Sequence, residues 1–340
     1  MGAVILSILV LGFLIFFHEL GHYLAARTAG VRVHELSLGF GPRIAGWHRN
    51  GIAYSIRLLP LGGYVRMAGE TPEDADDPNS FTKKPLRSRL GVIAAGPVAN
   101  LVLAVVLFFL VYGVVGVQVL ADDTPTVGRV LAGTPAAAAG VQAGDRIQAV
   151  DGQPISTWMD LVTVISSHPG KTMSLTVQRG SQILHLEATP EDRNGEGFLG
   201  ISARTRSLRE PPWTAAWHSL VLTGQMAVAL LLGLVAIFHT GLGGVTGPVG
   251  ITEMIGEASR MGLANLLFLA GALSAQLALF NLIPVPALDG SRLAFLVWEG
   301  IRGRPVDREK ENMVHFIGFA LLMLLMIVVT YRDVFRLIPG

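Results

Sequence analysis

Cysteine is absent from all 340 residues of the chain. Its absence excludes disulfide bonds, thiolate ligands for zinc and a cysteine nucleophile. Any metal ion that the protein binds must therefore be held by histidine, aspartate or glutamate.

Charged residues are also scarce. They make up 15% of the chain, against 51% hydrophobic residues, and the net charge is only +1. The basic residues are spaced out along the chain without a compact basic run, which gives no indication of nucleic-acid binding. A chain this apolar is typical of a protein embedded in a lipid bilayer.

Four apolar stretches are candidates for membrane spans, each of which requires about 20 residues in a helix. The unbroken run from Ala3 to Phe17 is too short by itself, so the first crossing has to include the residues that follow it. The other three stretches are 91–120, 263–283 and 313–331. No Lys or Arg precedes the first run, which argues against a cleaved signal peptide.

The motif His18-Glu19-Leu20-Gly21-His22 lies at the end of the first run. In a helix this spacing places both imidazoles on one face, where they can share a zinc ion, with Glu19 beside them as a base for water. Taken alone, the motif could also be polar residues that cap a helix. At membrane depth, however, ionisable side chains are functional candidates by default.

Two histidines leave a catalytic zinc site one protein ligand short. Asp289 is the candidate, because it follows two prolines that interrupt a helix, and broken backbone inside a membrane is tolerated where it lines a cavity. In isolation, Asp-Gly after Pro-x-Pro is more often a turn. The rival ligands, which lack helical register with the motif or lie on the other side of the membrane, are His34, His48, His239 and Glu253.

Charge also indicates the topology. Basic residues are concentrated between the first two stretches and after the third, so both loops are expected inside and both termini outside. Residues 219–238 are nearly uncharged, and hydropathy alone would count them as a fifth span. That crossing would separate Asp289 from the motif, so we expect the segment to lie along the outer interface or to enter the bilayer only partly.

Residues 122–206 are expected to form a soluble α+β domain on the outer side, because glycines and prolines punctuate short β-type runs. The stretch 133–152, including Gly144-Asp145-Arg146-Ile147, resembles bacterial PDZ domains. Such domains bind peptide ends beside a glycine-rich loop, whereas an empty groove would act as a steric filter. The candidate loop, which could equally be an ordinary last strand, is Gly197, Phe198, Leu199, Gly200 and Ile201.

Two further patterns bear on the site. Residues 51–67 alternate in polarity until Pro60 and Gly62-Gly63 break the pattern, which predicts a β-hairpin that on pattern alone could lie at the cytoplasmic surface. The small residues of 96–100 should allow the second span to pack closely on the first.

The two motifs together, His18-Glu19-x-x-His22 and Asn281-x-x-Pro284-x-Pro286-x-Leu288-Asp289-Gly290, resemble the site-2 protease family of intramembrane metalloproteases. The inserted PDZ-like domain is similar to that of its bacterial RseP-type branch. The chain departs from that branch in having room for one PDZ-like domain and in its apolar 219–238 segment.

This resemblance implies a zinc ion held by His18, His22 and Asp289, with Glu19 as general base. It also implies a membrane-dipping hairpin whose edge pairs with the substrate. The substrate-binding residues that it implies are Asn281, Pro284, Pro286, Gly62 and Gly63.

We therefore expect an α-helical polytopic membrane protein with four transmembrane helices, a membrane-associated β-hairpin and an inserted α+β PDZ domain. The expected segments are the first transmembrane helix (1–30), the hairpin region (31–89), the second transmembrane helix (90–121), the PDZ domain (122–206), an outer interfacial segment (207–262), the third transmembrane helix with the Asp289 loop (263–311), and the fourth with the tail (312–340).

The expected function is that of a zinc endopeptidase in a bacterial cytoplasmic membrane, with the PDZ domain outside and no nucleic-acid partner. It would cleave single-span proteins, and the resemblance implies anti-sigma factors or remnant signal peptides. Two other functions remain open. A PDZ adaptor that recruits exposed peptide ends would tolerate loss of the metal site, and a zinc-dependent transporter or sensor would have no evident need of Glu19.

Overall fold

The structure is a computed structural model that describes all residues except 1, 71–73, 75, 194, 241–245 and 338–340. The chain forms two compact units. The first unit consists of Met1–Val115 and Glu210–Gly340 and is mainly helical, and the second, Gly116–Arg209, is mainly β-structure.

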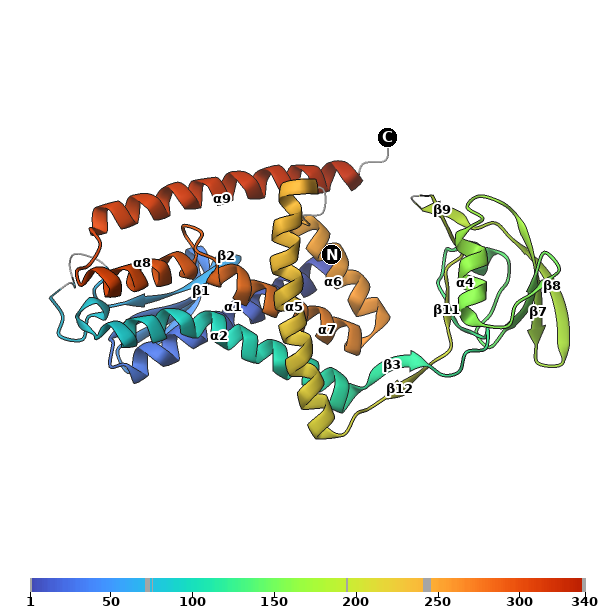
Figure 1. Ribbon diagram of the computed structural model, residues 1–340, viewed down its shortest axis with the longest axis horizontal. Coiled ribbons are helices and arrows are strands. Elements are labelled where there is room, and N and C mark those ends of the chain that lie inside the picture. The colour runs from blue at the N-terminus through green and yellow to red at the C-terminus, as the bar shows by residue number, and fades with distance from the viewer. Residues whose placement is uncertain (1, 71–73, 75, 194, 241–245, 338–340) are drawn as a thin grey trace. The chain divides into compact units, whose positions relative to one another are not determined.

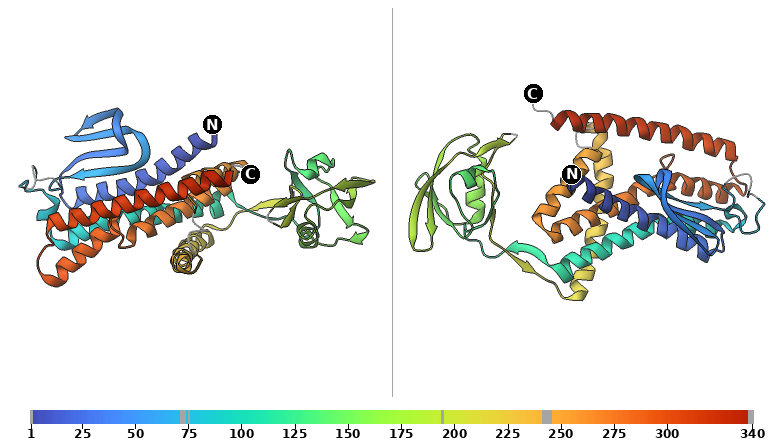
Figure 2. Two further views of the ribbon diagram at one scale, coloured as in Figure 1. Left: turned by 90° about the horizontal axis from the view of Figure 1, so that it is seen from above. Right: turned by 180° about the vertical axis from the view of Figure 1, so that it is seen from behind.

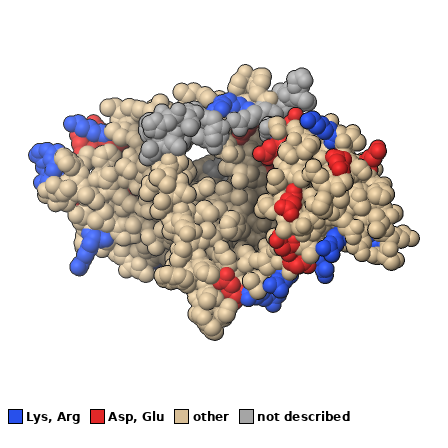
Figure 3. Space-filling model, turned by 45° about the vertical axis from the view of Figure 1, so that its right-hand side comes forward, with Lys and Arg blue, Asp and Glu red and all other residues tan. Residues whose placement is uncertain are grey.

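Long apolar helices dominate the first unit (Figure 1). Its helices are α1 (Gly2–Thr28), the short 3-10 helix η2 (Phe81–Lys83), α2 (Leu86–Phe109), the π-helical turn η3 (Leu110–Val115), α5 (Pro212–Thr240), α6 (Pro248–Met261), α7 (Leu263–Leu282), α8 (Asp289–Arg302) and α9 (Arg308–Leu337). Within the described residues, five helices are long and apolar enough to cross a membrane: α1, α2 with η3, α5, α7 and α9. Figure 3 shows broad areas of surface without any charged side chain, as lipid-facing helices require.

Helices α1, α2 and α7 pack against one another around Leu14, Leu103, Leu107 and Ala270. Small residues bring α1 and α2 close, since a Cβ built on Gly21 would lie 2.3 Å from the carbonyl oxygen of Ala95. Between helices in lipid, such close backbone contact replaces the hydrophobic driving force available in water. The expected close packing of the second span on the first is confirmed.

The second span ends earlier than expected. Helical structure stops at Val115, Gly116 adopts a φ of +94°, and Val117–Leu120 form strand β3 instead of a last helical turn. Glycine enters this left-handed region at little cost, so the chain can leave the helix there. The side chains of β3 alternate between half-buried and exposed, as in a strand. Counting the length of an apolar stretch does not detect this alternation.

Helix α5 contains the segment that hydropathy alone could not assign. Its candidate span, Pro212–Gly233, has a mean hydropathy of 1.5, the lowest of the five. In Figure 1 this helix runs across the direction of α2 and α9, and in the left view of Figure 2 it is seen end-on. Leu222 and Met226 of α5 pack near Phe108 of α2 and Phe268 of α7.

The expectation that residues 51–67 alone form a hairpin is wrong, because they form a single strand, β2 (Ile52–Met67), which pairs with the preceding strand β1 (Val33–Arg49). The turn between the two strands is Asn50-Gly51, with φ values of 52° and 76°, the chemistry that tight hairpin turns favour. Gly62-Gly63 lie inside β2, at an irregularity that lets Leu38 of β1 pair with both Ile56 and Gly63. Residues 33–38 of β1 therefore lie between two segments of β2, 53–56 on one side and 63–67 on the other. Residues 63–67 form an outer edge of the hairpin sheet.

The second unit has its own apolar core, which includes Ile147, Leu161 and Leu175. Its sheet of four strands has the order β6-β5-β7-β8, and the pairs β3–β12, β4–β11 and β9–β10 complete the β-structure. The remaining elements are β4 (Val127–Val130), α3 (Pro135–Ala138), β5 (Arg146–Val150), β6 (Gln153–Pro154), α4 (Trp158–Ser166), β7 (Met173–Arg179), β8 (Gln182–Ala188), β9 (Glu191–Arg193), β10 (Glu196–Phe198), β11 (Ile201–Ala203) and β12 (Thr205–Leu208). The β3–β12 pair extends the unit beyond the expected 122–206.

Candidate metal centre and its cavity

Helix α1 carries both motif histidines on one buried face, as the i, i+4 spacing predicts. The two Nε2 atoms lie 3.2 Å apart. Asp289 Oδ2 lies 3.0 Å from Nε2 of His18 and 3.2 Å from Nε2 of His22. His18, His22 and Asp289 thus form a group that could hold a metal ion, and the described part of the chain contains no other such group of three or more His, Asp or Glu residues.

The break between α7 and α8 brings Asp289 to this place. Helix α7 ends at Leu282, the proline at 284 has no N–H to continue it, and α8 begins at Asp289 itself. A Cβ built on Gly290 would lie 2.2 Å from the carbonyl oxygen of Ile283. Glycine at 290 therefore lets the first turn of α8 fold tightly against the end of α7. Helix α8, inside the expected Asp289 loop, was not anticipated from the sequence.

Helix α2 fixes the ring of His22. The Nδ1–H group of His22 donates a hydrogen bond of 2.9 Å to the carbonyl oxygen of Val92. This bond leaves the lone pair of Nε2 for a metal ion, the usual arrangement for a histidine ligand. The ring packs on Gly96, where a Cβ would lie 2.2 Å from Nε2.

The distances between the three candidate ligand atoms match those in a zinc site. Tetrahedral coordination at about 2.0–2.2 Å separates neighbouring ligand atoms by roughly 3.3 Å, close to the observed triangle. Nδ1 of His18 is buried without a hydrogen-bond partner among the described residues. Two imidazoles and one carboxylate form a donor set that fits zinc and leaves a fourth position for water or substrate.

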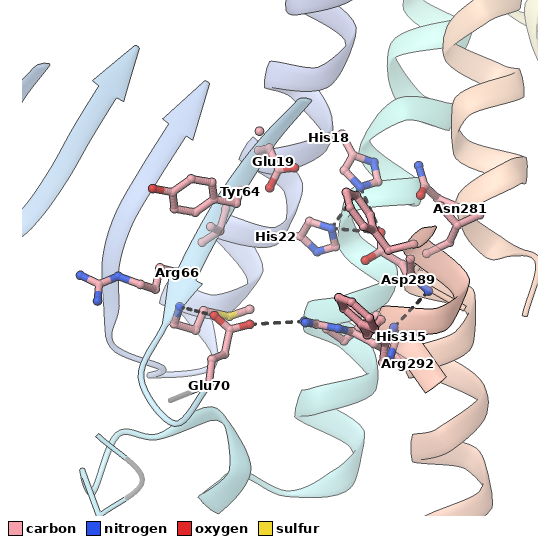
Figure 4. A pocket seen from close by; sticks show the side chains of 18 residues that line it. His18, Glu19, His22, Tyr64, Arg66, Glu70, Asn281, Asp289, Arg292 and His315 are labelled. Carbon is pink, nitrogen blue, oxygen red and sulfur yellow. Dashed lines mark hydrogen bonds and ion pairs between the residues drawn. The ribbon is translucent and has the colours of Figure 1, made fainter. Parts of the chain in front are cut away.

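The candidate ligands His18, His22 and Asp289 lie in the wall of a cavity of about 670 Å³, whose lining also includes Glu19, Gly63 and Asn281 (Figure 4). Gly63 brings strand β2 directly over Glu19, since a Cβ there would lie 2.8 Å from Cγ of Glu19. Nδ2 of Asn281 donates to the carbonyl oxygen of Leu277, 3.0 Å away.

Three expected substrate-binding residues do not line this cavity. Pro284 shapes the helix break, and Pro286 packs on Gly318 of α9. Gly62 has a φ of +143° and faces the ring of Phe40 instead.

The expected peptide loop of the second unit is closely packed. Leu199 is buried and its carbonyl oxygen accepts a hydrogen bond from the N–H of Ala136. Gly200 adopts a φ of +84° and lies against Thr134. Residues 197–198 belong to β10 and residue 201 to β11.

The rival ligands lie elsewhere. Nε2 of His34 is 3.0 Å from Asp74 Oδ2, and His48 and Glu253 are exposed. The side chain of His239 lies outside the described residues.

Sequence reasoning missed His315, Arg292 and Glu70, which also line the cavity. Arg292 of α8 forms an ion pair with Glu70 at 3.3 Å. His315 was detectable in principle, because it is an ionisable residue inside the last apolar stretch.

An electrostatic network supports the hairpin beside the cavity. Glu35 accepts hydrogen bonds from the Ser55 hydroxyl at 2.6 Å and from Arg57 at 2.8 Å. Burial would raise the pKa of the Glu35 carboxyl group, but these bonds outweigh burial and hold that pKa below its usual value. The network fixes β1 against β2 at the level of the cavity.

A His-Glu-x-x-His helix, a distant carboxylate beside it and a surround of apolar helices define a membrane-embedded metalloprotease. The chain matches Peptidase family M50 over residues 6–325 and belongs to that family.

Named relatives agree with this assignment. The Regulator of sigma-W protease RasP of Bacillus subtilis is 35% identical, with 99% of each chain covered. The Zinc metalloprotease RasP of Bacillus licheniformis is 33% identical, over 99% of this chain and 100% of the relative. A putative zinc metalloprotease of Clostridium acetobutylicum is 35% identical over 97% of each. Among solved structures, a PDZ domain of an SdrC-like protein from Listeria monocytogenes matches 26% of this chain and 93% of its own, with 26% identity and a TM-score of 0.22.

The protein is therefore an intramembrane zinc metalloendopeptidase of the site-2 protease type and a multi-pass bacterial membrane protein. It is an enzyme rather than an adaptor or a transporter.

Proposed function

We propose that this protease cuts the membrane segments of single-span proteins at a zinc ion held by His18, His22 and Asp289, with Glu19 as general base. One observation carries the proposal. Ligand atoms from α1 and α8 meet within 3.0–3.2 Å of one another, in the wall of a cavity that also includes Glu19.

His18, His22 and Asp289 would hold a zinc ion, which would supply Lewis-acid chemistry at the scissile carbonyl and lower the pKa of water towards about 7. Glu19 takes a proton from the attacking water and returns it to the leaving amine. Asn281 uses one amide N–H for Leu277, so the second is available to a substrate carbonyl oxygen. The bond between His22 and Val92 holds the imidazole in position throughout.

A helical substrate hides its peptide groups in its own hydrogen bonds, so it must unwind to be cut. Residues 63–67 of β2 offer a template, because they pair with 33–38 on one side and line the cavity. An extended peptide can add to such an edge through backbone hydrogen bonds. Gly63 would then set the distance between the added strand and Glu19.

We propose four crossings, with α5 along the outer interface. Support comes from the direction of α5 across α2 and α9 and from its packing on the C-terminal end of α2. Helix α6 also contacts the helix ends that we assign to the outer side. Its Gly256 packs on Ala3 at the start of α1, and its Gly250 N–H donates to Asp333 near the end of α9. Both termini and the second unit then lie outside, with the basic loops inside.

We further propose that the second unit is a PDZ domain that controls which proteins reach the membrane site, either by binding peptide ends or by steric exclusion. Its β4–β11 pair beside α4 supports the fold. The Bacillus subtilis relative has the name Regulator of sigma-W protease RasP, which connects it to a sigma factor. The proposed substrates are therefore membrane-anchored regulators of sigma factors. Remnant signal peptides are a second class.

The test is Glu19→Gln. The purified variant should keep about one zinc per chain, because the substitution removes no ligand. Its rate of cleaving a transmembrane peptide should fall by about 10²–10⁴-fold, the typical contribution of a general base. Glu253→Gln, on the exposed face of α6, is the matched control. Cleavage by Glu19→Gln at the wild-type rate would exclude Glu19 as the base.

A further inference from the structure

A side chain of the last helix holds the turn that precedes Asp289. The backbone N–H of Ala287 donates a hydrogen bond to Nδ1 of His315, at 3.1 Å, across 28 positions of sequence. Figure 4 shows His315 beside Asp289, which points towards His18 and His22, and the bond links α9 to the turn before Asp289. Ala287 is only two residues before Asp289.

The backbone at Ala287 is strained. Its φ is +77°, in the left-handed region that side-chain-bearing residues avoid. Such a conformation persists only where the surroundings hold it, and it tends to occur at functional sites. The hydrogen bond from Ala287 to His315 is a direct restraint on that conformation.

Helix α9 contacts the same turn a second time. A Cβ built on Gly318 would lie 2.2 Å from Cβ of Pro286, so the absence of a side chain at 318 lets α9 approach the turn. His315 and Gly318 are three residues apart and thus lie on one face of α9. One helical face therefore contacts both Pro286 and Ala287.

The hydrogen bond also determines the state of the His315 ring. Because the partner of Nδ1 is a backbone N–H, Nδ1 must accept, and the ring proton of the neutral imidazole is on Nε2. Nε2 is buried without a hydrogen-bond partner among the described residues, and Glu311 Oε1 lies 3.9 Å away. The ring packs near Phe295 of α8, with centroids 6.0 Å apart. The contacts of His315 thus join α9, the turn and α8.

We propose that His315 is a positioning residue for the zinc site: by accepting the Ala287 N–H, it stabilises the left-handed turn that directs Asp289 at His18 and His22. This inference deepens the proposed function and rests on Asp289 being a zinc ligand. His315 itself touches neither the metal nor the reacting atoms. By holding the turn, His315 reduces the conformational freedom of Asp289 before zinc binds.

Zinc affinity is the direct measurement, made by competition with a chromophoric chelator on the full-length protein in detergent. His315→Phe keeps a ring but has no acceptor, and it should weaken zinc binding by about 10–100-fold, as loss of an outer partner typically does. His315→Asn places an acceptor oxygen where Nδ1 lies and should stay close to the wild type. Met313→Ala, on an exposed position of the same helix, is the matched control and should bind zinc normally.

Ala287→Gly separates positioning from general packing. Glycine adopts the left-handed φ without strain, so this substitution should restore most of the zinc affinity in the His315→Phe background. A purely structural role for the ring would give no such rescue. If His315→Phe does not fold, His315→Ala provides the same comparison without an acceptor.

Unchanged zinc affinity in both acceptor-free variants, or failure of Ala287→Gly to restore it, would overturn the proposal. Asp289→Ala distinguishes this failure from failure of the proposed function. If Asp289→Ala loses zinc while His315→Phe retains it, only the positioning role is wrong. If Asp289→Ala binds zinc like the wild type, the proposed ligand set is wrong.

Discussion

His18 Nε2 lies 3.0 Å from Asp289 Oδ2, although 271 positions separate the two residues in the chain. Neither α1 nor α8 contains a complete metal site. The three proposed ligands meet only when the start of α8 lies beside the motif of α1, so assembly of the helices and metal binding should stabilise each other.

Replacing Asp289 should therefore be costly for the metal. Asp289→Ala removes one of three protein ligands, and we expect zinc affinity to fall by more than the roughly 10–100-fold typical of an outer-partner loss. Zinc content after dialysis against a chelator gives the measurement. Glu253→Ala, an exposed acid on α6, should retain zinc. Equal zinc retention by both variants would mean that Asp289 is not a ligand.

Close packing at Gly96 should also affect zinc affinity. A methyl group at 96 would lie 2.2 Å from His22 Nε2, so Gly96→Ala must displace the ring or separate α1 from α2. We expect a loss of at least about tenfold in zinc affinity, comparable to loss of an outer partner. Gly91→Ala on the same helix meets nothing within 4 Å and is the control. If the two variants bind zinc equally well, the packing does not hold His22.

The proposed zinc ligands could be found from sequence because each is polar where the chain is otherwise apolar. The i, i+4 spacing of His18 and His22 is a local property, and the structure places both rings on one face of α1. Asp289 was identified through the prolines that break α7. Local patterns thus located the parts of the site, and the structure adds the distances between them.

Tertiary packing determined what the sequence did not reveal. Nothing near His315 in the chain indicates that it accepts a bond from Ala287, since that contact depends on how α9 packs. The hairpin turn was misplaced because Leu38 pairs with both Ile56 and Gly63, a register that simple alternation does not encode. The end of the second span was overestimated because residues 117–120, apolar apart from Gln118, are extended rather than helical.

The second unit should lose stability in acid through Asp145. This side chain is 1% exposed and receives two hydrogen bonds of 2.8 Å from Arg179. Burial would raise the pKa of Asp145, but the bonds from Arg179 and from the N–H of Gln142 outweigh burial and lower it. The stabilisation is therefore fully present above the unfolded-state pKa of about 3.9 and is lost as the pH falls through the lower folded-state value.

Asp145→Asn should lower the free energy of unfolding at pH 7 by about 1–3 kcal/mol, because the substitution breaks a charge-assisted pair with a buried member. It should also reduce, by the share due to Asp145, the loss of stability that the wild type shows below about pH 4. Hydrogen exchange of β5 and β7 in the full-length protein measures both effects. Glu191→Gln breaks a pair that is 54% exposed on both sides and should change little. Equal effects of the two substitutions would contradict a stabilising role for the Asp145–Arg179 ion pair.

The absence of cysteine makes the four-crossing topology directly testable by single-cysteine labelling. Ser181→Cys lies in the β7–β8 turn of the second unit, and Arg304→Cys lies in the exposed loop after α8. With α5 at the interface, a membrane-impermeant maleimide should label Ser181→Cys in intact cells and Arg304→Cys only in inverted vesicles. If α5 crosses the membrane, the loop after α8 moves to the side of the second unit, and both positions label in intact cells. That result would also place the start of α8 on the wrong side for Asp289 to reach the inner half of α1, so it would contradict the proposed zinc site as well as the topology.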